Sequence, residues 1–216
     1  MRLRTHDARA TRQALADAGT DLFAAHGFAG TNVDRIARRA GVNKAMINYH
    51  FGGKRGLYVA ILLATMSELA TRLKGLVDLA RPADEQLKQF IDVFSQVMSS
   101  RPAIARIMIR EVAAGGPNLD DQVLPHFLAI FSVVRGILER GISEGRFRAT
   151  SPLLTHLSLV GGLVFFFVSE PIRARLLRTG QLPAPMPTAE EFAWHFQDLI
   201  GRGLAVTSPG SNRGRR

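Results

Sequence analysis

The sequence predicts an all-α fold of about nine helices: a three-helix head in residues 1–53, a larger helical domain in residues 54–207 and a tail in residues 208–216. Two observations carry this prediction. Apolar residues recur every three or four positions along most of the chain, and no segment shows the sustained alternation of a half-buried strand. Gly, Pro and good N-cap residues divide these periodic stretches into pieces of helix length.

Residues 7–27 are expected to form the first helix, because apolar residues recur at helical spacing until Gly27. A second, shorter helix follows: Thr31 is a good N-cap, Asp34 completes a short version of a capping box, and the apolar stripe ends at Ala40. Four Arg residues near the start fit either a basic arm that reaches DNA or a frayed, solvated terminus. They are Arg2, Arg4, Arg9 and Arg12.

A tight turn joins the second helix to a third, which is expected from Lys44 to His50. Gly41 supplies the permissive backbone of the turn, Asn43 is a second N-cap, and Ile47 is the inward anchor. Helix, glycine turn and helix is the geometry that places a second helix in the major groove of DNA. The third helix also carries residue types that bind phosphates and base edges. The residues expected to contact DNA are Thr31, Asn43, Lys44, Ala45, Met46, Asn48, Tyr49, His50 and Lys54.

The head is also the more basic part of the chain for its size. The formal net charge is +10, and residues 1–60 hold ten Lys and Arg against four Asp. A basic head favours a polyanion, although charge alone also fits an acidic membrane surface. The alternative is an ordinary helical protein whose basic residues are simply solvated. Such a protein would not require the phosphate-binding side chains found between Asn43 and Lys54. A sequence-independent DNA-coating protein would use the same head and stays an alternative.

The larger domain is predicted to be a helical bundle. Ser151 is an N-cap, and Thr188 with Glu191 forms a capping box. Gly161 and Gly162 permit close helix approach, and we expect the last two helices to pair with their copies in a homodimer. The expected helices span residues 54–80, 87–98, 104–112, 123–138, 152–168 and 188–200.

Phe- and Met-rich stripes in this domain form either an ordinary core or the lining of a ligand cavity. For most individual residues of these stripes, a place in an ordinary packed core is the simpler interpretation. Polar residues beside the stripes favour a cavity for a small hydrophobic or aromatic effector, which would be anionic if Arg110 faces inward. The candidate lining residues are Phe90, Phe94, Met98, Met108, Arg110, Glu111, His126, Phe127, Phe131, His156 and Phe166.

The sequence predicts no enzyme, no metal site and no cofactor. The chain has no Cys, which excludes disulfides and cysteine zinc sites, and its six His are scattered. Residues 141–145 match the G-x-S-x-G pattern of serine hydrolases, with Ser143 as the nucleophile. That pattern needs a preceding strand, whereas a helix is expected here, so the hydrolase is a distant alternative.

The expected location is the cytoplasm, with no membrane partner. The first residues lack the apolar core of a signal peptide, and the most apolar run, residues 157–168, is too short to span a bilayer. The tail in residues 208–216 is short of apolar residues and is expected to be disordered.

The segment from Ala40 to Leu57 resembles the signature of TetR/AcrR-type transcriptional regulators. Asn43 stands where that signature has Ser, which keeps the cap, and Asn48 stands at a common Tyr, whose contact Tyr49 and His50 take over in part. The matching positions are Ala40, Gly41, Val42, Ile47, His50, Phe51, Lys54 and Leu57.

This resemblance implies a dimeric, ligand-responsive and sequence-specific regulator, most readily a repressor. Such a dimer is expected to bind a palindromic operator whose half-sites lie about 34–36 Å apart, or a multiple of that. The resemblance also implies an effector cavity in the C-terminal domain.

Overall fold

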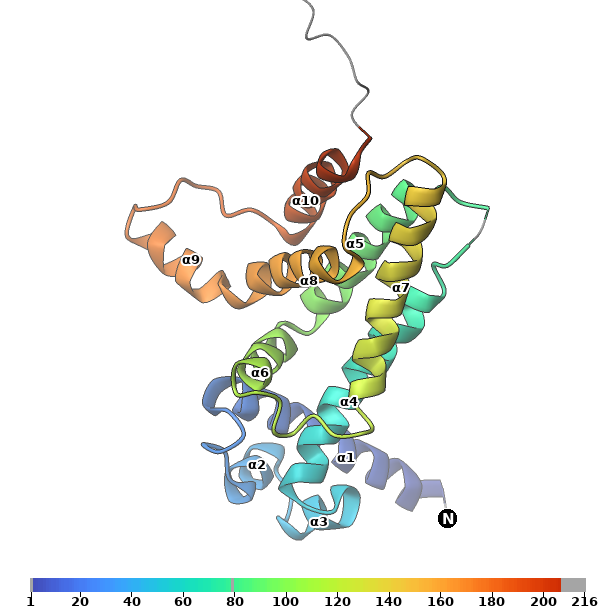
Figure 1. Cartoon of the computed structure of the whole chain (residues 1–216). Helices are drawn as coiled ribbons and strands as arrows, with labels where there is room; N and C mark the ends of the chain where they lie inside the picture. The colour runs from blue at the N-terminus through green and yellow to red at the C-terminus, as the bar shows by residue number, and fades with distance from the viewer. Residues whose placement is uncertain (1, 79, 207–216) are drawn as a thin grey trace, which may run out of the picture. The chain divides into compact units, whose positions relative to one another are not determined.

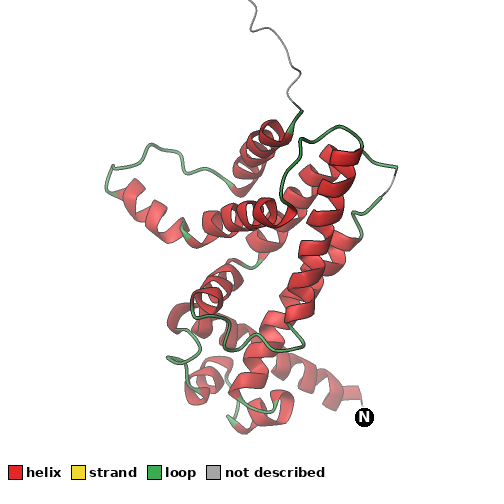
Figure 2. Ribbon diagram, viewed as in Figure 1, coloured by secondary structure: helices red, strands yellow, loops and turns green. Residues whose placement is uncertain are grey.

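The computed structural model describes residues 2–78 and 80–206, with the backbone alone for residues 2–7. The described residues form ten helices, and apart from an isolated bridge between Phe147 and Ala205 they contain no strand (Figure 2). The all-α prediction is therefore confirmed. The helices are α1 (Arg2–His26), α2 (Val33–Ala40), α3 (Ala45–Phe51), α4 (Lys54–Lys74), α5 (Ala83–Ser100), α6 (Pro102–Ala113), α7 (Leu124–Ser143), α8 (Pro152–Val168), α9 (Glu170–Arg178) and α10 (Ala189–Leu204) (Figure 1).

The chain divides into two compact units. The first contains residues 1–70 and 97–128, and the second contains residues 71–96 and those from 129 onward. The division falls within α4, α5 and α7, so it differs from the domain boundary that the sequence suggests after residue 53. That boundary stays a prediction.

The first unit places a hydrophobic core behind the two short helices α2 and α3. Leu15 and Phe23 of α1, Ile36 of α2 and Ile47 of α3 are fully buried. The ring of Tyr58, from α4, packs edge-on against Phe23 with 4.9 Å between the ring centroids. Because burial of apolar side chains stabilises a fold, these contacts anchor the two short helices on α1 and α4.

In the second unit α10 packs on α8 through aromatic rings. The rings of Phe166 and Phe192 stack with their centroids 4.1 Å apart, and Phe196 continues the stack at 5.3 Å from Phe192. A Cβ atom added to Gly162 would lie 2.7 Å from the ring of Phe196, whereas nothing lies within 4 Å of one added to Gly161. The close approach predicted for these glycines therefore occurs within one chain at Gly162 and leaves Gly161 open.

Several predicted helix boundaries are confirmed and others are wrong. Ser151 caps α8, and Thr188 with Glu191 forms the capping box of α10. The fourth helix ends at Lys74 rather than at residue 80, since Gly75 follows and disfavours helix. Helix α9 was not predicted, and the tail in residues 208–216 lies outside the described residues.

Helix α4 is long and apolar enough to cross a membrane by length and composition. However, 56% of its most apolar window is buried inside the structure, as in a core helix of a folded domain. Helices α8 and α9 reach the required length only together and are bent by 48° at their junction.

Candidate nucleic-acid interface

Helix α2 is capped by Asn32 rather than by Thr31. The side chain of Asn32 accepts a hydrogen bond from the backbone N–H of Arg35 at 2.9 Å. The hydroxyl of Thr31 instead donates to the backbone oxygens of Leu22 and Gly27, and its side chain is buried. The prediction of Thr31 as an N-cap is wrong, and a buried, hydrogen-bonded hydroxyl is not placed to contact DNA.

The turn between α2 and α3 has the predicted glycine geometry. Gly41 has φ of 69°, a left-handed conformation that glycine adopts without strain. Val42 N–H then donates to the carbonyl of Ala37 at 3.0 Å. The side chain of Asn43 accepts a hydrogen bond from the N–H of Ala45 at 2.8 Å. The helix begins at Ala45, however, and Lys44 occupies the N-cap position without a side-chain cap hydrogen bond, so the prediction of Asn43 as the N-cap is wrong by one residue.

Helix α3 has one inward residue and an outward face. Ile47 is fully buried, whereas Ala45 and Asn48 are exposed and Tyr49 has 76% of its surface exposed. The Tyr49 ring lies edge-on to His50, with centroids 4.9 Å apart. A helix held by one side chain leaves its other side chains free to approach another molecule. The exposed Tyr49 side chain joins an apolar ring to a hydroxyl that can hydrogen-bond a partner.

Three exposed polar contacts link the short helices to each other and to α1. Arg39 of α2 pairs with Asp21 of α1 at 2.6 Å, and Arg35 contacts the ring of His26 at 3.0 Å. Lys44 pairs with Asp34 at 3.1 Å. Because the paired side chains are more than half exposed, each ion pair contributes only about 0–1 kcal/mol to stability. Lys44 can therefore exchange Asp34 for a phosphate at little cost.

Close backbone packing joins α3 to α4. A Cβ atom on Gly56 would lie 1.7 Å from the carbonyl oxygen of Phe51, so only glycine fits at this position. Gly52 and Gly53 have φ of 71° and 114°. Lys54 opens α4, and its ammonium nitrogen lies 4.4 Å from the centre of the Phe28 ring. This cation–π contact keeps a positive charge near the free N–H groups of α4.

Two further exposed cations lie on the helices before and after α3 and were not among the predicted DNA contacts. Arg38 is exposed in the last turn of α2, and Arg55 is exposed in the first turn of α4. Among the residues with described side chains, neither makes an ion pair. The sequence could have identified both arginines, because they lie outside the apolar stripes of their helices. A phosphate contact needs only an exposed cation near the helix that reads the bases.

A buried polar network lies behind the head. Tyr58 Oη donates to Glu111 Oε2 at 2.8 Å, and the backbone N–H of Asn118 donates to Glu111 Oε1 at 2.5 Å. Burial, the hydrogen bond to Glu111 and its negative charge raise the pKa of Tyr58 well above its ordinary value. Glu111 was predicted to line a ligand cavity, but its carboxylate is already bound by these donors. Arg110, next to it, is exposed and reaches the carbonyl of Ala25, so it does not face inward.

The other candidate effector residues fall in both units. Met98 and Met108 are buried in the first, where His126 and Phe127 are half-buried. Phe90 and Phe94 are buried in the second unit.

Two second-unit candidates differ in how firmly they are held. Phe131 packs edge-on against His156 at 5.3 Å, and burial lowers the pKa of His156, whose Nδ1 has no partner among the described residues. Phe166 is committed to the stack with Phe192. An unpaired buried nitrogen is suited to a ligand, whereas a stacked ring is part of the core.

The residues around Ser143 do not form a hydrolase site. Ser143 ends α7, and its hydroxyl donates to the carbonyl of Arg140 at 2.8 Å. The required strand is replaced by a helix. No group of three or more metal-ligating side chains occurs among the described residues.

Known proteins match both parts of the chain. Residues 15–61 match the profile described as bacterial regulatory proteins, tetR family, and residues 80–166 match that of a tetracyclin repressor-like C-terminal domain. The HTH-type transcriptional regulator RutR of Escherichia coli K12 is 27% identical over 149 residues, which are 69% of this chain and 70% of that protein. The HTH-type transcriptional repressor NicS of Pseudomonas putida is 25% identical over 173 residues, 78% of this chain and 80% of that protein.

Solved structures show the same fold at low sequence identity. A bacterial regulatory protein of the tetR family from Rhodococcus RHA1 gives a TM-score of 0.76 at 16% identity, over 92% of this chain and 98% of that one. The ketosteroid transcriptional regulator KstR2 of Mycobacterium tuberculosis gives 0.73 at 21% identity, over 91% of this chain and 95% of that one.

Proposed function

The chain belongs to the TetR family and is a DNA-binding transcriptional regulator, and from this premise we propose that it represses transcription by inserting α3 of each subunit of a homodimer into a palindromic operator. The family consists of transcriptional regulators, so the protein is not an enzyme. Family members bind DNA operators and typically act as dimers with small-molecule effectors.

The outward face of α3 carries this proposal. Ile47 holds the helix to the core, while Asn48 and the strongly exposed Tyr49 stand clear of it. An Asn side chain can pair two hydrogen bonds with an adenine edge, and Lys and Tyr can bind phosphates. We assign Asn43, Lys44, Ala45, Met46, Asn48, Tyr49, His50 and Lys54 to the interface, with Arg38 and Arg55 as further phosphate contacts.

A triple substitution tests the interface. Lys44→Ala, Tyr49→Ala and Lys54→Ala together are expected to weaken operator binding by at least about 100-fold, because several charge-assisted phosphate contacts of roughly 1 kcal/mol or more are lost in each subunit. Fluorescence anisotropy with labelled operator measures the change. The control is Lys74→Ala with Arg178→Ala, two exposed cations outside the head. Unchanged affinity of a folded triple variant would rule out α3 as the reading helix.

The exposed apolar face of α8 and α10 supports dimerisation through these helices, which are the last two that the sequence predicted. Such a patch is costly in water and marks an interface. Gly161 lies on the same face, four residues from Leu157 and from Phe165, and leaves room for a second helix. The exposed apolar residues are Leu153, Leu154, Leu157, Phe165, Trp194 and Leu199.

The effector is proposed to be a hydrophobic or aromatic molecule that binds in the C-terminal domain beside His156. The half-buried ring, its unpaired Nδ1 and the neighbouring Phe131 support this assignment. Such a ligand releases DNA only if it prefers the conformation that does not fit the operator. A panel of hydrophobic and aromatic molecules tests this assignment, with the melting temperature of the protein and the release of operator DNA as readouts. If no molecule raises the melting temperature or releases the operator, the proposed cavity is wrong.

A regulator of this kind acts where the chromosome lies. We therefore place the protein in the cytoplasm of a bacterium.

A further inference from the structure

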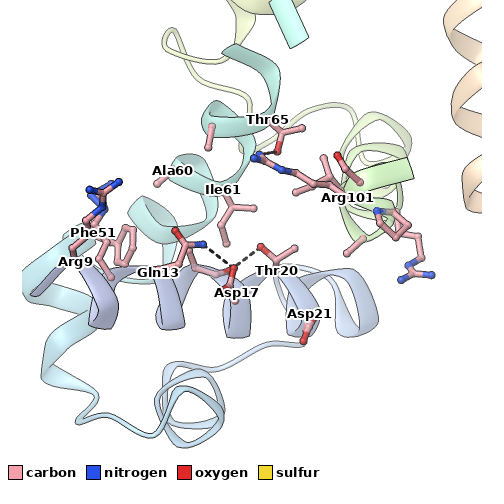
Figure 3. A pocket seen from close by; sticks show the side chains of 18 residues that line it. Arg9, Gln13, Asp17, Thr20, Asp21, Phe51, Ala60, Ile61, Thr65 and Arg101 are labelled. Atoms are coloured by element: carbon pink, nitrogen blue, oxygen red, sulfur yellow. Dashed lines mark hydrogen bonds between the residues drawn. The ribbon is translucent and has the colours of Figure 1, made fainter. Parts of the chain in front are cut away.

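A groove in the first unit lies between α1, α4 and the beginning of α6. Its volume is about 720 Å³, which is typical of small-molecule sites. Figure 3 shows Gln13, Asp17 and Thr20 of α1 along one wall, Ile61 of α4 behind them, and Arg101 on the side of α6. None of the residues proposed above to bind DNA or effector lines it.

The groove carries more positive than negative charge. Arg101 is neutralised by Glu68 at 2.9 Å, and Arg12 stacks on the ring of Phe51 at 4.8 Å. The other two arginines of the groove, Arg9 and Arg106, have no ion pair or hydrogen bond among the residues with described side chains. Arg106 is also half-buried. The four Arg residues that line the groove are Arg9, Arg12, Arg101 and Arg106.

The acidic residues of the groove do not balance these cations. Asp21 is bound at 2.6 Å by Arg39, which lies outside the groove. Asp17 accepts a hydrogen bond from Gln13 at 2.9 Å and is the one acidic group of the lining without a cationic partner in the described part of the chain. The guanidinium of Arg106 has no acidic partner in the described part of the chain, so its N–H donors remain available to an anionic ligand.

The floor of the groove is apolar. Ala60, Ile61 and Ala64 come from α4, and Ile104 comes from α6. Ile61 and Ile104 are almost fully buried, whereas Ala60 is half-buried and Ala64 is exposed, so the two alanines present most of the accessible apolar surface. A ligand that matches this surface has an apolar chain that covers the small residues and displaces water from them.

We propose that this groove is a second small-molecule site, which binds a carboxylate carrying an acyl chain. The planar guanidinium of Arg106 pairs with the carboxylate through two parallel hydrogen bonds. The acyl chain lies over Ala60 and Ala64. The site is separate from the effector cavity proposed beside His156, because every residue that lines the groove belongs to the first unit.

Calorimetric titration of the full chain with dodecanoate tests the proposal, with dodecanol as the uncharged analogue. Saturable binding of dodecanoate is expected, and dodecanol and the variant Arg106→Gln are each expected to bind about tenfold more weakly or worse, since a charge-assisted hydrogen bond is lost. Ala64→Leu fills the groove and is expected to weaken binding by a similar factor. The matched controls are Arg178→Gln and Ala113→Leu, exposed positions outside the groove. Equal binding by all variants, or none at millimolar dodecanoate, would overturn the site.

The position of the ligand is read independently from the isoleucine methyl groups. With isotope-labelled isoleucine, dodecanoate is expected to shift the NMR signals of Ile61 and Ile104 and to leave those of Ile130 and Ile137 unchanged. The second pair is buried in α7, in the other unit. Shifts confined to Ile130 and Ile137 would refute the groove and support the separate effector cavity. Loss of the groove therefore does not remove the proposed repressor function.

Discussion

At the scale of single residues, a buried hydrogen bond between Tyr58 and Glu111 links α4 to α6. The hydroxyl of Tyr58 donates a hydrogen bond to Glu111, whose carboxylate has no cationic partner among the described residues. A hydrogen bond to a charged acceptor contributes about 1.5–3 kcal/mol, and a buried carboxylate that loses a donor is destabilised. The sequence could not pair these residues, which lie 53 positions apart.

The pKa of Tyr58 gives this network a pH dependence. The pKa is raised above its ordinary value of 10.0 in the folded chain, so the folded state holds the proton more tightly than the unfolded state. The stability that Tyr58 contributes is therefore complete below about pH 10 and is lost as the pH rises further. Urea unfolding should show wild type losing about 1.4 kcal/mol per pH unit more than Tyr58→Phe in that range. Tyr49→Phe, at the exposed and only other tyrosine, should lose stability as wild type does; parallel curves for all three would contradict the network.

The N-cap of α2 marks the limit of prediction at single residues. Thr31 and Asn32 are both good caps, and the sequence pattern does not distinguish them. The structure uses Asn32 because Thr31 turns inward to Leu22 and Gly27. That choice depends on how the loop packs against α1, which is a tertiary contact.

At the scale of helices, two adjacent glycines are expected to have separate roles. Gly161→Leu should leave the chain folded, since nothing lies within 4 Å of the added Cβ, but should convert a dimer to a monomer by holding the partner helix away. Gly162→Ala should instead lower the stability of each subunit by about 1–3 kcal/mol, because its Cβ meets Phe196.

Light scattering and urea unfolding separate the two effects. The matched control is Gly136→Leu, an exposed position of α7 that also has nothing within 4 Å, and this variant should stay dimeric. If Gly161→Leu dimerises as tightly as wild type, the apolar face of α8 is not the interface.

Most helices could be predicted because their apolar stripes and caps are local signals. Helix α9 could not, since none of its residues is buried and its apolar stripe is short. Pro171 in its first turn also reads as a break. The turn and Ile47 of the candidate DNA interface were predicted correctly, because glycine at positive φ and a single inward residue follow from spacing alone.

At the scale of the whole molecule, the basic head predicts a strong salt dependence. Each phosphate contact adds about −0.9 to the slope of log affinity against log salt. Lys44→Ala is therefore expected to reduce the slope by about 1.8 for a dimer. Lys74→Ala, outside the head, should leave the slope unchanged. An unaltered slope for Lys44→Ala would mean that Lys44 keeps its pair with Asp34 when DNA is bound.

Capture of sheared genomic DNA on the purified protein at physiological salt, followed by sequencing, tests the proposed repressor most directly. A few sharp peaks that share an inverted repeat are expected, and the triple variant at Lys44, Tyr49 and Lys54 should lose them. Diffuse recovery across the genome by the wild-type protein, before and after refolding to remove bound ligand, would contradict sequence-specific binding and favour a DNA-coating protein.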